Sequence, residues 1–220
     1  WGQHLEDWQA SIFDGRRPLA VDGPHPSDVM ILGKMPWKEE IAEGRNLVGA
    51  SGEILTEYLI RMHAGDARDW YVTNLCKFMP PEGSGTRIRS GWLQDCMPLL
   101  HAELRLVRPR YVLCLGADAS KALMGPKATV SWMDGRVMDL RIPVHMSIDD
   151  EPEFHEFCAM TVLHPAEVAR SPDKGRVLER GVSRFLLLKS GVRFDVEEPD
   201  IDHRVIDTLE DAEAWCEEVD

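Results

Sequence analysis

The sequence lacks the cysteine spacing of a metal centre. No two cysteines form a Cys-x-x-Cys pair, and their number, five, is odd. Structural zinc sites and self-contained iron–sulfur clusters need four ligands at usable positions, so we expect no metal and no cofactor. The thiols are expected to be reduced, as in intracellular proteins. The five are Cys76, Cys96, Cys114, Cys158 and Cys216.

Long apolar runs are also missing. The sequence shows neither a signal-peptide pattern nor an apolar span of membrane length. We therefore expect a cytoplasmic protein with no membrane partner. Its 220 residues suffice for one well-buried core.

Positive charge is scarce, but the excess of acidic residues is unevenly distributed along the chain. The formal net charge is −13, which at first argues against a nucleic-acid partner, because phosphate contacts need Lys and Arg. Residues 192–220 hold two basic and twelve acidic residues, a net of −10, which leaves −3 for residues 1–191. The body of the chain is therefore compatible with a local basic groove.

Apolar segments of strand length alternate with amphipathic segments of helix length. Because the strands are apolar on both faces, this order predicts an α/β fold, a three-layer sandwich with a central, mainly parallel four-stranded sheet and helices on both faces. The expected strands lie near 29–32, 71–74, 111–115 and 160–163, and the main helices near 52–65, 92–109, 117–125 and 173–191.

Each predicted strand ends in glycine or polar residues. In parallel sheets ligands bind beyond the carboxyl ends of the strands, so these ends are expected to form one site. They are Gly33-Lys34-Met35-Pro36, Thr73-Asn74, Gly116-Ala117-Asp118 and His164-Pro165.

Short motifs follow one another in a fixed order from residue 28 to about residue 190. They are "GKMP", "GRNLVGASGEIL", "YVTNLCKFMPP", "CMPLL", "RPRYVLCLGADASKALMG" and "TVLHPAEVARSP". In this order they resemble the uracil-DNA glycosylase superfamily, most closely its family 4. That family has Gly-Glu-Ala-Pro-Gly for the first motif and Gly-x-Pro-Phe-Val-Gly-x-Ala-Gly-x-Leu-Leu for the second.

The resemblance implies roles for the residues at the strand ends. Such enzymes flip a base out of the DNA stack, and Asn74 would read uracil O4 and N3–H through its amide. His164 would stabilise the negative charge that develops on the leaving uracil. Gly33, Met35, Pro36 and Leu47 would complete the substrate site.

The resemblance also implies a DNA-binding surface. Val168 would wedge the minor groove, and Arg170 would hold a phosphate. Arg87 and Arg89, in a loop rich in Gly and Pro, are either further phosphate contacts or part of a solvated loop. The expected partner is single-stranded DNA, or DNA with a flipped base.

Three positions depart from the family pattern. Lys34 replaces its glutamate, so we expect a binding group at the rim of the base site and not a general base. Leu47 replaces the aromatic residue that stacks on the flipped base. Phe78 stands where the family has a cluster cysteine, the early Cys-x-x-Cys is absent and only Cys96 matches, so no iron–sulfur cluster is expected.

The acidic end of the chain predicts a separate unit. We assign residues 1–191 to the glycosylase-like domain, 192–200 to a linker, and 201–220 to a strand followed by a helix. This tail is either a simple appendage or the start of a proofreading exonuclease domain. The second alternative resembles phage polymerases of family A that carry a glycosylase-like domain in front, in a bacterial or phage-infected cell.

Three functions remain open at this point. The first is hydrolytic removal of uracil, or of a uracil-like modified base, from DNA. The second is a catalytically silent DNA-binding module of the same fold, attached to a replicative polymerase. The third is an unrelated small-molecule α/β enzyme, which the absence of any Gly-x-Gly-x-x-Gly or phosphate-loop motif disfavours.

Overall fold

The structure is a computed structural model that describes residues 18–81, 87–133, 136–145 and 153–192. The expected linker and tail at 192–220 lie almost entirely outside these residues, so their predicted structure stays a prediction. No helix in the described part of the chain is long and apolar enough to cross a membrane.

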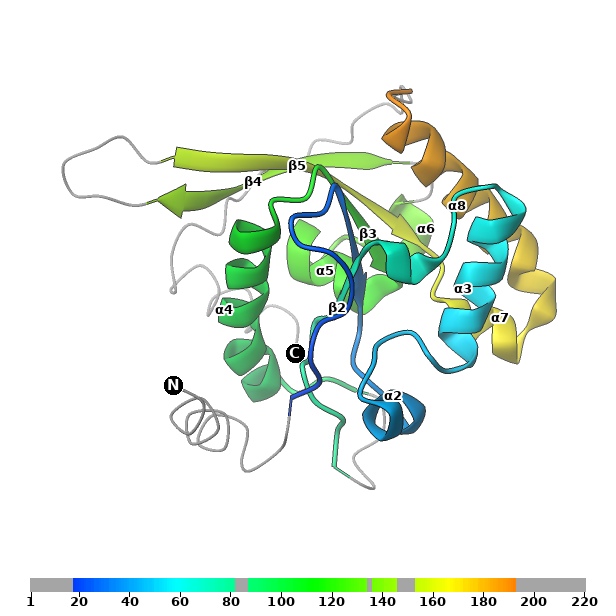
Figure 1. Cartoon of the computed structure of the whole chain (residues 1–220), viewed down its shortest axis with the longest axis horizontal. Coiled ribbons are helices and arrows are strands. Elements are labelled where there is room, and N and C mark those ends of the chain that lie inside the picture. The colour runs from blue at the N-terminus through cyan, green and yellow to red at the C-terminus, as the bar shows by residue number, and fades with distance from the viewer. Residues whose placement is uncertain (1–17, 82–86, 134–135, 146–152, 193–220) are drawn as a thin grey trace.

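The centre of the fold is a five-stranded sheet of order β2-β1-β3-β5-β4 (Figure 1). The first four strands in that order are mutually parallel, and β4 pairs antiparallel with β5. All four predicted strands are present. The strands are β1 (Val29–Gly33), β2 (Tyr71–Asn74), β3 (Tyr111–Leu115), β4 (Val137–His145) and β5 (Glu153–Val162).

The prediction of four strands was wrong by one, because β4 was missed. Its sequence, VMDLRIPVH, contains Pro143, and a proline argues against a strand inside a sheet because it has no N–H to donate. As the edge strand, β4 tolerates this proline, and its pairing with β5 shifts register between Pro143 and His145. The sheet is therefore mixed, with an antiparallel edge.

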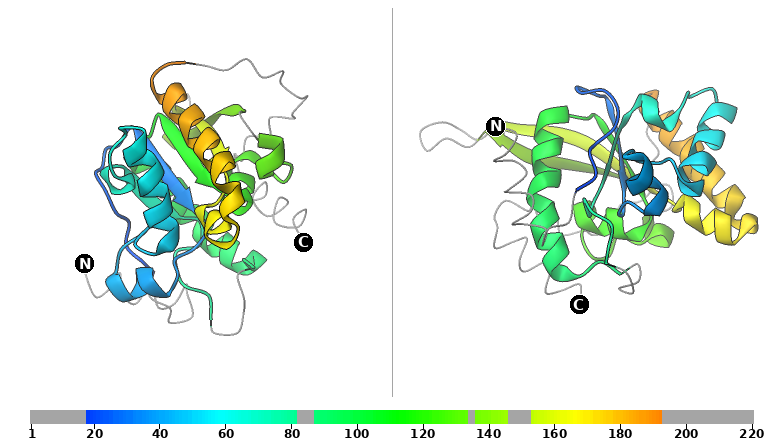
Figure 2. Two further views of the ribbon diagram at one scale, coloured as in Figure 1. Left: turned by 90° about the vertical axis from the view of Figure 1, so that its right-hand side faces the viewer. Right: turned by 60° about the horizontal axis from the view of Figure 1, so that its bottom comes forward.

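Helices cover both faces, as the three-layer prediction requires (Figure 2). Alternate residues of each strand point to opposite faces, so Val29 and Ile31 belong to one core and Met30 and Leu32 to the other. The first core is covered by α3 (Ala50–Arg61) and α8 (Gly175–Lys189). The second is covered by α4 (Ser90–Val107), α5 (Ala117–Met124) and α6 (Val130–Met133). The short α2 (Lys38–Glu43) and α7 (Pro165–Arg170) follow strand ends.

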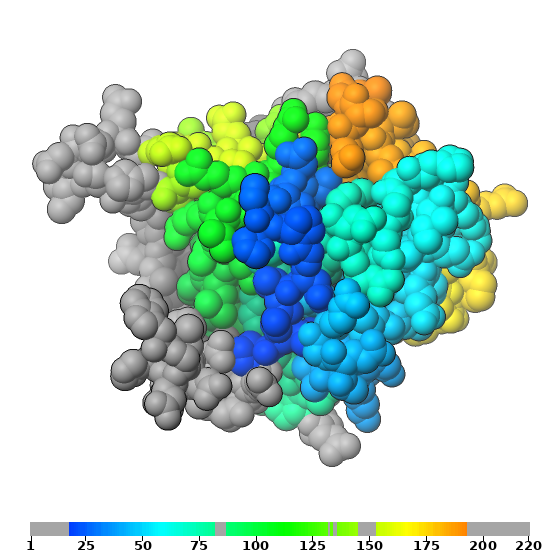
Figure 3. Space-filling view, in the orientation of Figure 1, coloured from blue at the N-terminus to red at the C-terminus, as the bar shows by residue number. Residues whose placement is uncertain are grey.

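A segment before β1, residues 18–22, runs along the outer edge of β2, and we call it the strap. Asp22 forms an antiparallel bridge with Val72, with Val72 N–H donating to Asp22 O at 2.8 Å. Leu19 N–H donates to Lys77 O at 2.8 Å. In Figure 3 the strap belongs to the blue band that crosses the molecular surface between α4 and the α2–α3 region. The strap thereby brings its polar groups next to the carboxyl ends of β1 and β2.

Candidate active site at the carboxyl edge of the sheet

The polar ends of β2, β1, β3 and β5 meet at one edge of the sheet. Gly33 and Asn74 are register partners, and Cys76 N–H donates to Lys34 O at 2.8 Å. On the other side of β1, Gly116 N–H donates to Val162 O at 2.9 Å, two residues before His164. The order of the strands therefore places Asn74, Lys34 and His164 along the same edge.

The Asn74 side chain is buried and held in place. It is 8% exposed, and its Nδ2 donates to Asn46 Oδ1 at 2.7 Å. A Cβ on Gly33 would lie 2.4 Å from Asn74 Oδ1, so the amide requires glycine at that position. Gly33 thus has a steric role, which is to let the amide lie across the end of β1.

The loop that carries Leu47 is fixed by a partly buried carboxylate. Glu40 accepts a hydrogen bond from Leu47 N–H at 2.8 Å and another from Trp37 N–H at 2.7 Å. Burial raises the pKa of Glu40, although these two hydrogen bonds oppose the shift. Leu47 has a φ of 54°, and its carbonyl oxygen would lie 1.9 Å from a Cβ on Gly52. Leu47 packs against the core beneath α3, where it keeps an apolar surface.

Lys34 forms an ion pair with Asp118 in the first turn of α5. Lys34 Nζ lies 2.8 Å from Asp118 Oδ2, and the two side chains are 22% and 50% exposed. At this exposure an ion pair contributes about 0–1 kcal/mol to stability, so the pair can rearrange at little cost. Asp118 was noted in the sequence only as a polar strand end, and no sequence signal pointed to its pairing with Lys34.

His164 begins α7 as its N-cap residue. Its Nδ1 accepts a hydrogen bond from Ala166 N–H at 3.1 Å, so a neutral imidazole carries its proton on Nε2. Burial, followed by the positive charges of Lys34 and Arg170, lowers the pKa of His164 below its usual value of 6.5. The ring is therefore neutral at pH 7, with one N–H available as a donor.

The sequence also matches known proteins along most of its length. The model of the uracil DNA glycosylase superfamily matches residues 21–184. The type-4 uracil-DNA glycosylase of Pyrobaculum aerophilum is 34% identical over 182 residues, which cover 75% of this chain and 84% of that protein. The type-4 uracil-DNA glycosylase of Archaeoglobus fulgidus is 27% identical over 154 residues, 68% of this chain and 71% of that protein.

The chain belongs to the uracil-DNA glycosylase superfamily. The domain bounds expected at 1–191 and 192–200 stay predictions.

The other residues of the superfamily motifs lie around the same edge. Pro36 is buried, and Met35 packs against the cluster formed by Phe78 and Trp92. Val168, on α7, is partly buried against the core shared with α3.

The three candidate phosphate contacts fall into two groups. Arg170 is exposed at the end of α7 and pairs with Glu167. Arg87 and Arg89 precede α4, which packs on the opposite face of the sheet from α7. The Arg89 guanidinium lies 5.1 Å from the centre of the Trp92 ring. The two groups therefore flank the strand ends from different sides, while residues 82–86 of the intervening loop lie outside the described part of the chain.

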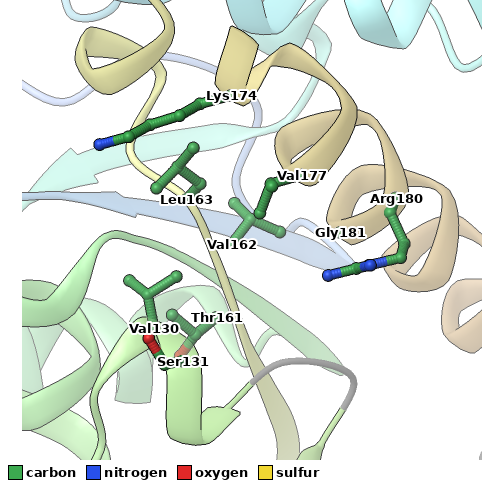
Figure 4. Close-up of a pocket in the computed structure, with 9 residues that line it drawn as sticks. All are labelled: Val130, Ser131, Thr161, Val162, Leu163, Lys174, Val177, Arg180 and Gly181. Atoms are coloured by element: carbon green, nitrogen blue, oxygen red, sulfur yellow. The ribbon is translucent and has the colours of Figure 1, made fainter. Parts of the chain in front are cut away.

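A cavity of about 430 Å³ opens beside β5 (Figure 4). Its walls come from α6, the end of β5 and the start of α8, and Lys34, Asn74 and His164 do not line it. Leu163, which precedes His164, is one of its lining residues. The others are Val130, Ser131, Thr161, Val162, Lys174, Val177, Arg180 and Gly181.

Apolar side chains fill the region next to the position of the family's cluster cysteines. Cys76, Phe78, Trp92 and Cys96 form one buried cluster, in which the two aromatic rings meet edge to face with centroids 5.6 Å apart. Among the described residues, no group of three or more His, Cys, Asp or Glu could hold a metal ion. These residues do not fit a cluster held by four thiolates. The expected lack of a cofactor stays a prediction, which iron and sulfide analysis of the purified protein tests.

Proposed function

We propose that this chain hydrolyses the N-glycosyl bond between deoxyribose and uracil, or a modified base with uracil's Watson–Crick edge, in DNA. The observation that carries the proposal is the placement of a fixed amide, Asn74, at the end of β2 and a neutral imidazole, His164, after the end of β5, on the same edge of the sheet. The two named relatives, both type-4 uracil-DNA glycosylases, support it. Single-stranded DNA is the favoured substrate, because flipping costs least where the base is unpaired.

Asn74 is the residue that reads the base. Uracil presents an acceptor at O4 and a donor at N3, which match the N–H and the carbonyl oxygen on one edge of an amide. Cytosine presents a donor and an acceptor in the inverted order, so the same orientation of Asn74 rejects it. Leu47 and Pro36 supply apolar surface for the ring without the stacking energy that an aromatic residue would add.

His164 acts on the leaving group. As the bond from C1′ to the base breaks, the electron pair moves onto uracil and negative charge grows on O2. The Nε2–H of a neutral imidazole donates a hydrogen bond to this oxygen, and the charge-assisted bond strengthens as the charge develops. Water adds to C1′ and its proton is released, which completes the hydrolysis.

The ion pair between Lys34 and Asp118, at the end of β1, slows the hydrolysis. A carboxylate at this position would stabilise the cationic sugar and orient water, whereas the ammonium of Lys34 opposes that charge. Lys34 therefore serves as a binding group at the rim of the site, and its partner Asp118 is the only carboxylate that an observed contact places there among the described residues. We accordingly assign slow hydrolysis to the wild-type protein.

The DNA strand is bound on both sides of this edge. We assign a wedge to Val168 and phosphate contacts to Arg170, Arg87 and Arg89. Because the body carries a small net charge, binding is expected to be weak and strongly dependent on salt.

A second candidate function is a base-reading module that binds uracil DNA without cutting it. The observation that favours it is the same ion pair, because Lys34 replaces the family's glutamate and pairs with the carboxylate of Asp118. The two functions share base recognition through Asn74 and differ only in turnover.

One experiment separates these functions. Single-stranded oligonucleotides with one uracil, 5-hydroxymethyluracil, hypoxanthine or cytosine are incubated with the protein, and free base is measured by chromatography. We expect release of uracil or hydroxymethyluracil and no release of cytosine. Selective binding of uracil DNA without release of any base would favour the silent module. Release of hypoxanthine alone would contradict the role of Asn74 as the residue that reads uracil, which both candidate functions share.

A further inference from the structure

We propose that Asn46 is a specificity-determining positioning residue, which holds the Asn74 amide in the one orientation that reads uracil and rejects cytosine. The inference rests on the proposed function, because it deepens the recognition step of the same site. Asn46 is 2% exposed and stands where the family motif has proline, a residue with no side-chain amide.

The orientation of Asn46 is fixed by the strap. Its Nδ2 donates to Ala20 O at 2.7 Å and to Asp22 Oδ2 at 3.2 Å, and its backbone N–H also donates to Asp22 Oδ2. A backbone carbonyl and a carboxylate only accept hydrogen bonds, so the amide nitrogen of Asn46 has to face the strap. Its oxygen, Oδ1, therefore faces Asn74.

This arrangement determines which atom of Asn74 lies toward Asn46. Asn74 Nδ2 donates to Asn46 Oδ1 at 2.7 Å, whereas a flipped Asn74 would bring two amide oxygens together without a proton between them. Buried acceptors left unpaired in this way are strongly disfavoured. The hydrogen bonds therefore run in one direction, from Asn74 to Asn46 to the strap.

The direction matters because an amide has two different N–H bonds. Reading uracil uses Asn74 Oδ1 together with the N–H on the same side as that oxygen. The other N–H points away from the base. It can therefore donate a hydrogen bond to Asn46 without competing with uracil. Without Asn46, both orientations of the Asn74 amide become available, and the second one matches cytosine.

The test measures binding, so that it does not depend on catalysis. Single-stranded oligonucleotides carry one 2′-fluoro-2′-deoxyuridine or one 2′-fluoro-2′-deoxycytidine, whose N-glycosyl bonds resist hydrolysis. The ratio of the two dissociation constants, cytidine over uridine, is determined by fluorescence anisotropy. We expect Asn46→Ala, and the nearly isosteric Asn46→Leu, to lower this ratio about tenfold, the scale of one hydrogen bond lost from recognition.

Two controls separate positioning from general damage. Arg45→Ala changes the same loop and the same partner, since Arg45 Nε lies 3.5 Å from Asp22 Oδ1, but it does not contact Asn74. Its ratio should stay within about twofold of wild type, the range expected for an exposed ion pair. Asn74→Ala should abolish the preference, and adding Asn46→Ala to it should change the ratio no further, because Asn46 acts through Asn74.

The outcomes are distinct. A ratio that Asn46→Ala and Asn46→Leu leave unchanged overturns the positioning role while base recognition stands. A wild-type ratio near one overturns the proposed recognition itself. Should neither variant fold, the side-chain NH₂ signals of Asn74 in the wild-type protein decide the matter. One slowly exchanging amide proton supports the inference, and rapid exchange of both contradicts it.

Discussion

Asn74 is 8% exposed and bonded to a second buried amide, whereas Lys34 and Asp118, which pair at the same edge, are 22% and 50% exposed. We call the two buried amides, Asn46 and Asn74, the recognition half of the site. Lys34, Asp118 and His164 form its reaction half. The recognition half is neutral and its hydrogen bonds have a fixed direction, while the reaction half is charged and partly open to solvent.

The difference between the halves suggests which property of the superfamily is retained. Buried neutral networks hold one geometry, because breaking any bond in them leaves an unpaired polar group. An exposed ion pair contributes little and rearranges easily when a phosphate or a sugar arrives. We infer that base recognition is preserved in this chain and that the chemical step is the altered part.

The largest expected effect lies beneath the recognition half. Lys77 is 4% exposed, and its Nζ donates to Glu103 Oε2 at 2.7 Å and to Thr73 Oγ1 at 2.8 Å. Burial lowers the pKa of Lys77, and Glu103 opposes the shift. Glu103→Ala leaves a buried ammonium without its partner and should lower the free energy of unfolding by about 3–5 kcal/mol.

Urea denaturation measures this change. The double variant Glu103→Ala with Lys77→Met removes both charges and should recover most of the loss. Glu57→Ala, which breaks the exposed pair with Arg61, is the matched surface control and should leave the free energy of unfolding nearly unchanged. A small cost for Glu103→Ala would mean that the buried pair does not support β2.

The next effect tests the reaction half alone. His164→Ala removes the donor to uracil O2 and should lower kcat by about 10²- to 10³-fold, the usual cost of losing one donor to a developing oxyanion. The affinity for the uridine analogue should change little, because recognition depends on Asn74. Single-turnover kinetics and anisotropy check the two parts. Loss of binding equal to the loss of rate would show that the halves are not separable.

Restoring a carboxylate should raise the rate. We expect Lys34→Glu together with Asp118→Ser to release uracil at least about tenfold faster than wild type, a conservative figure for a positioned carboxylate. Lys34→Glu alone should gain less, since two neighbouring carboxylates raise each other's pKa. Lys34→Met with Asp118→Ser removes both charges and controls for the loss of the ion pair. A slower reaction in Lys34→Glu/Asp118→Ser would assign Lys34 a part in the chemistry.

The smallest effect is a shift in pH dependence. The reaction needs neutral His164, whose pKa is lowered by burial first and then by Lys34 and Arg170. The rate should therefore be constant above this pKa and fall as the pH drops through it. Lys34→Met removes one of the cations, so the pKa of His164 should rise and the acid limb should move to higher pH. Lys38→Met, at an exposed position, is the control. An acid limb that does not move in Lys34→Met would mean that Lys34 does not act on the imidazole.

Local patterns were enough to predict the four parallel strands and the edge at which their polar ends meet. Apolar runs that end in glycine or polar residues drew attention to Asn74 and His164, which share one edge because parallel strands bring their carboxyl ends together, while the roles of both residues stay predictions. The antiparallel strand β4 was missed because Pro143 and the charged Asp139 and Arg141 hide its apolar positions. Only pairing with β5 makes it a strand.

The hydrogen bonds that fix the site could not be predicted. Asn46 pairs with Asn74 across 28 positions and with Asp22 across 24, and Glu40 holds Leu47 across seven. In the sequence such polar residues indicate only turns and loops, because no periodic pattern links a polar side chain to a distant partner. Their roles become visible only when the strap, the loop and β2 are brought together in space.

The most direct test of this account is single-turnover release of uracil from single-stranded DNA by the wild-type protein and by Asn74→Ala and Lys34→Glu/Asp118→Ser. The account predicts slow, complete release by wild type, faster release by the double variant, and none above background by Asn74→Ala. Release by Asn74→Ala at the wild-type rate, or no release by either wild type or the double variant, would contradict it.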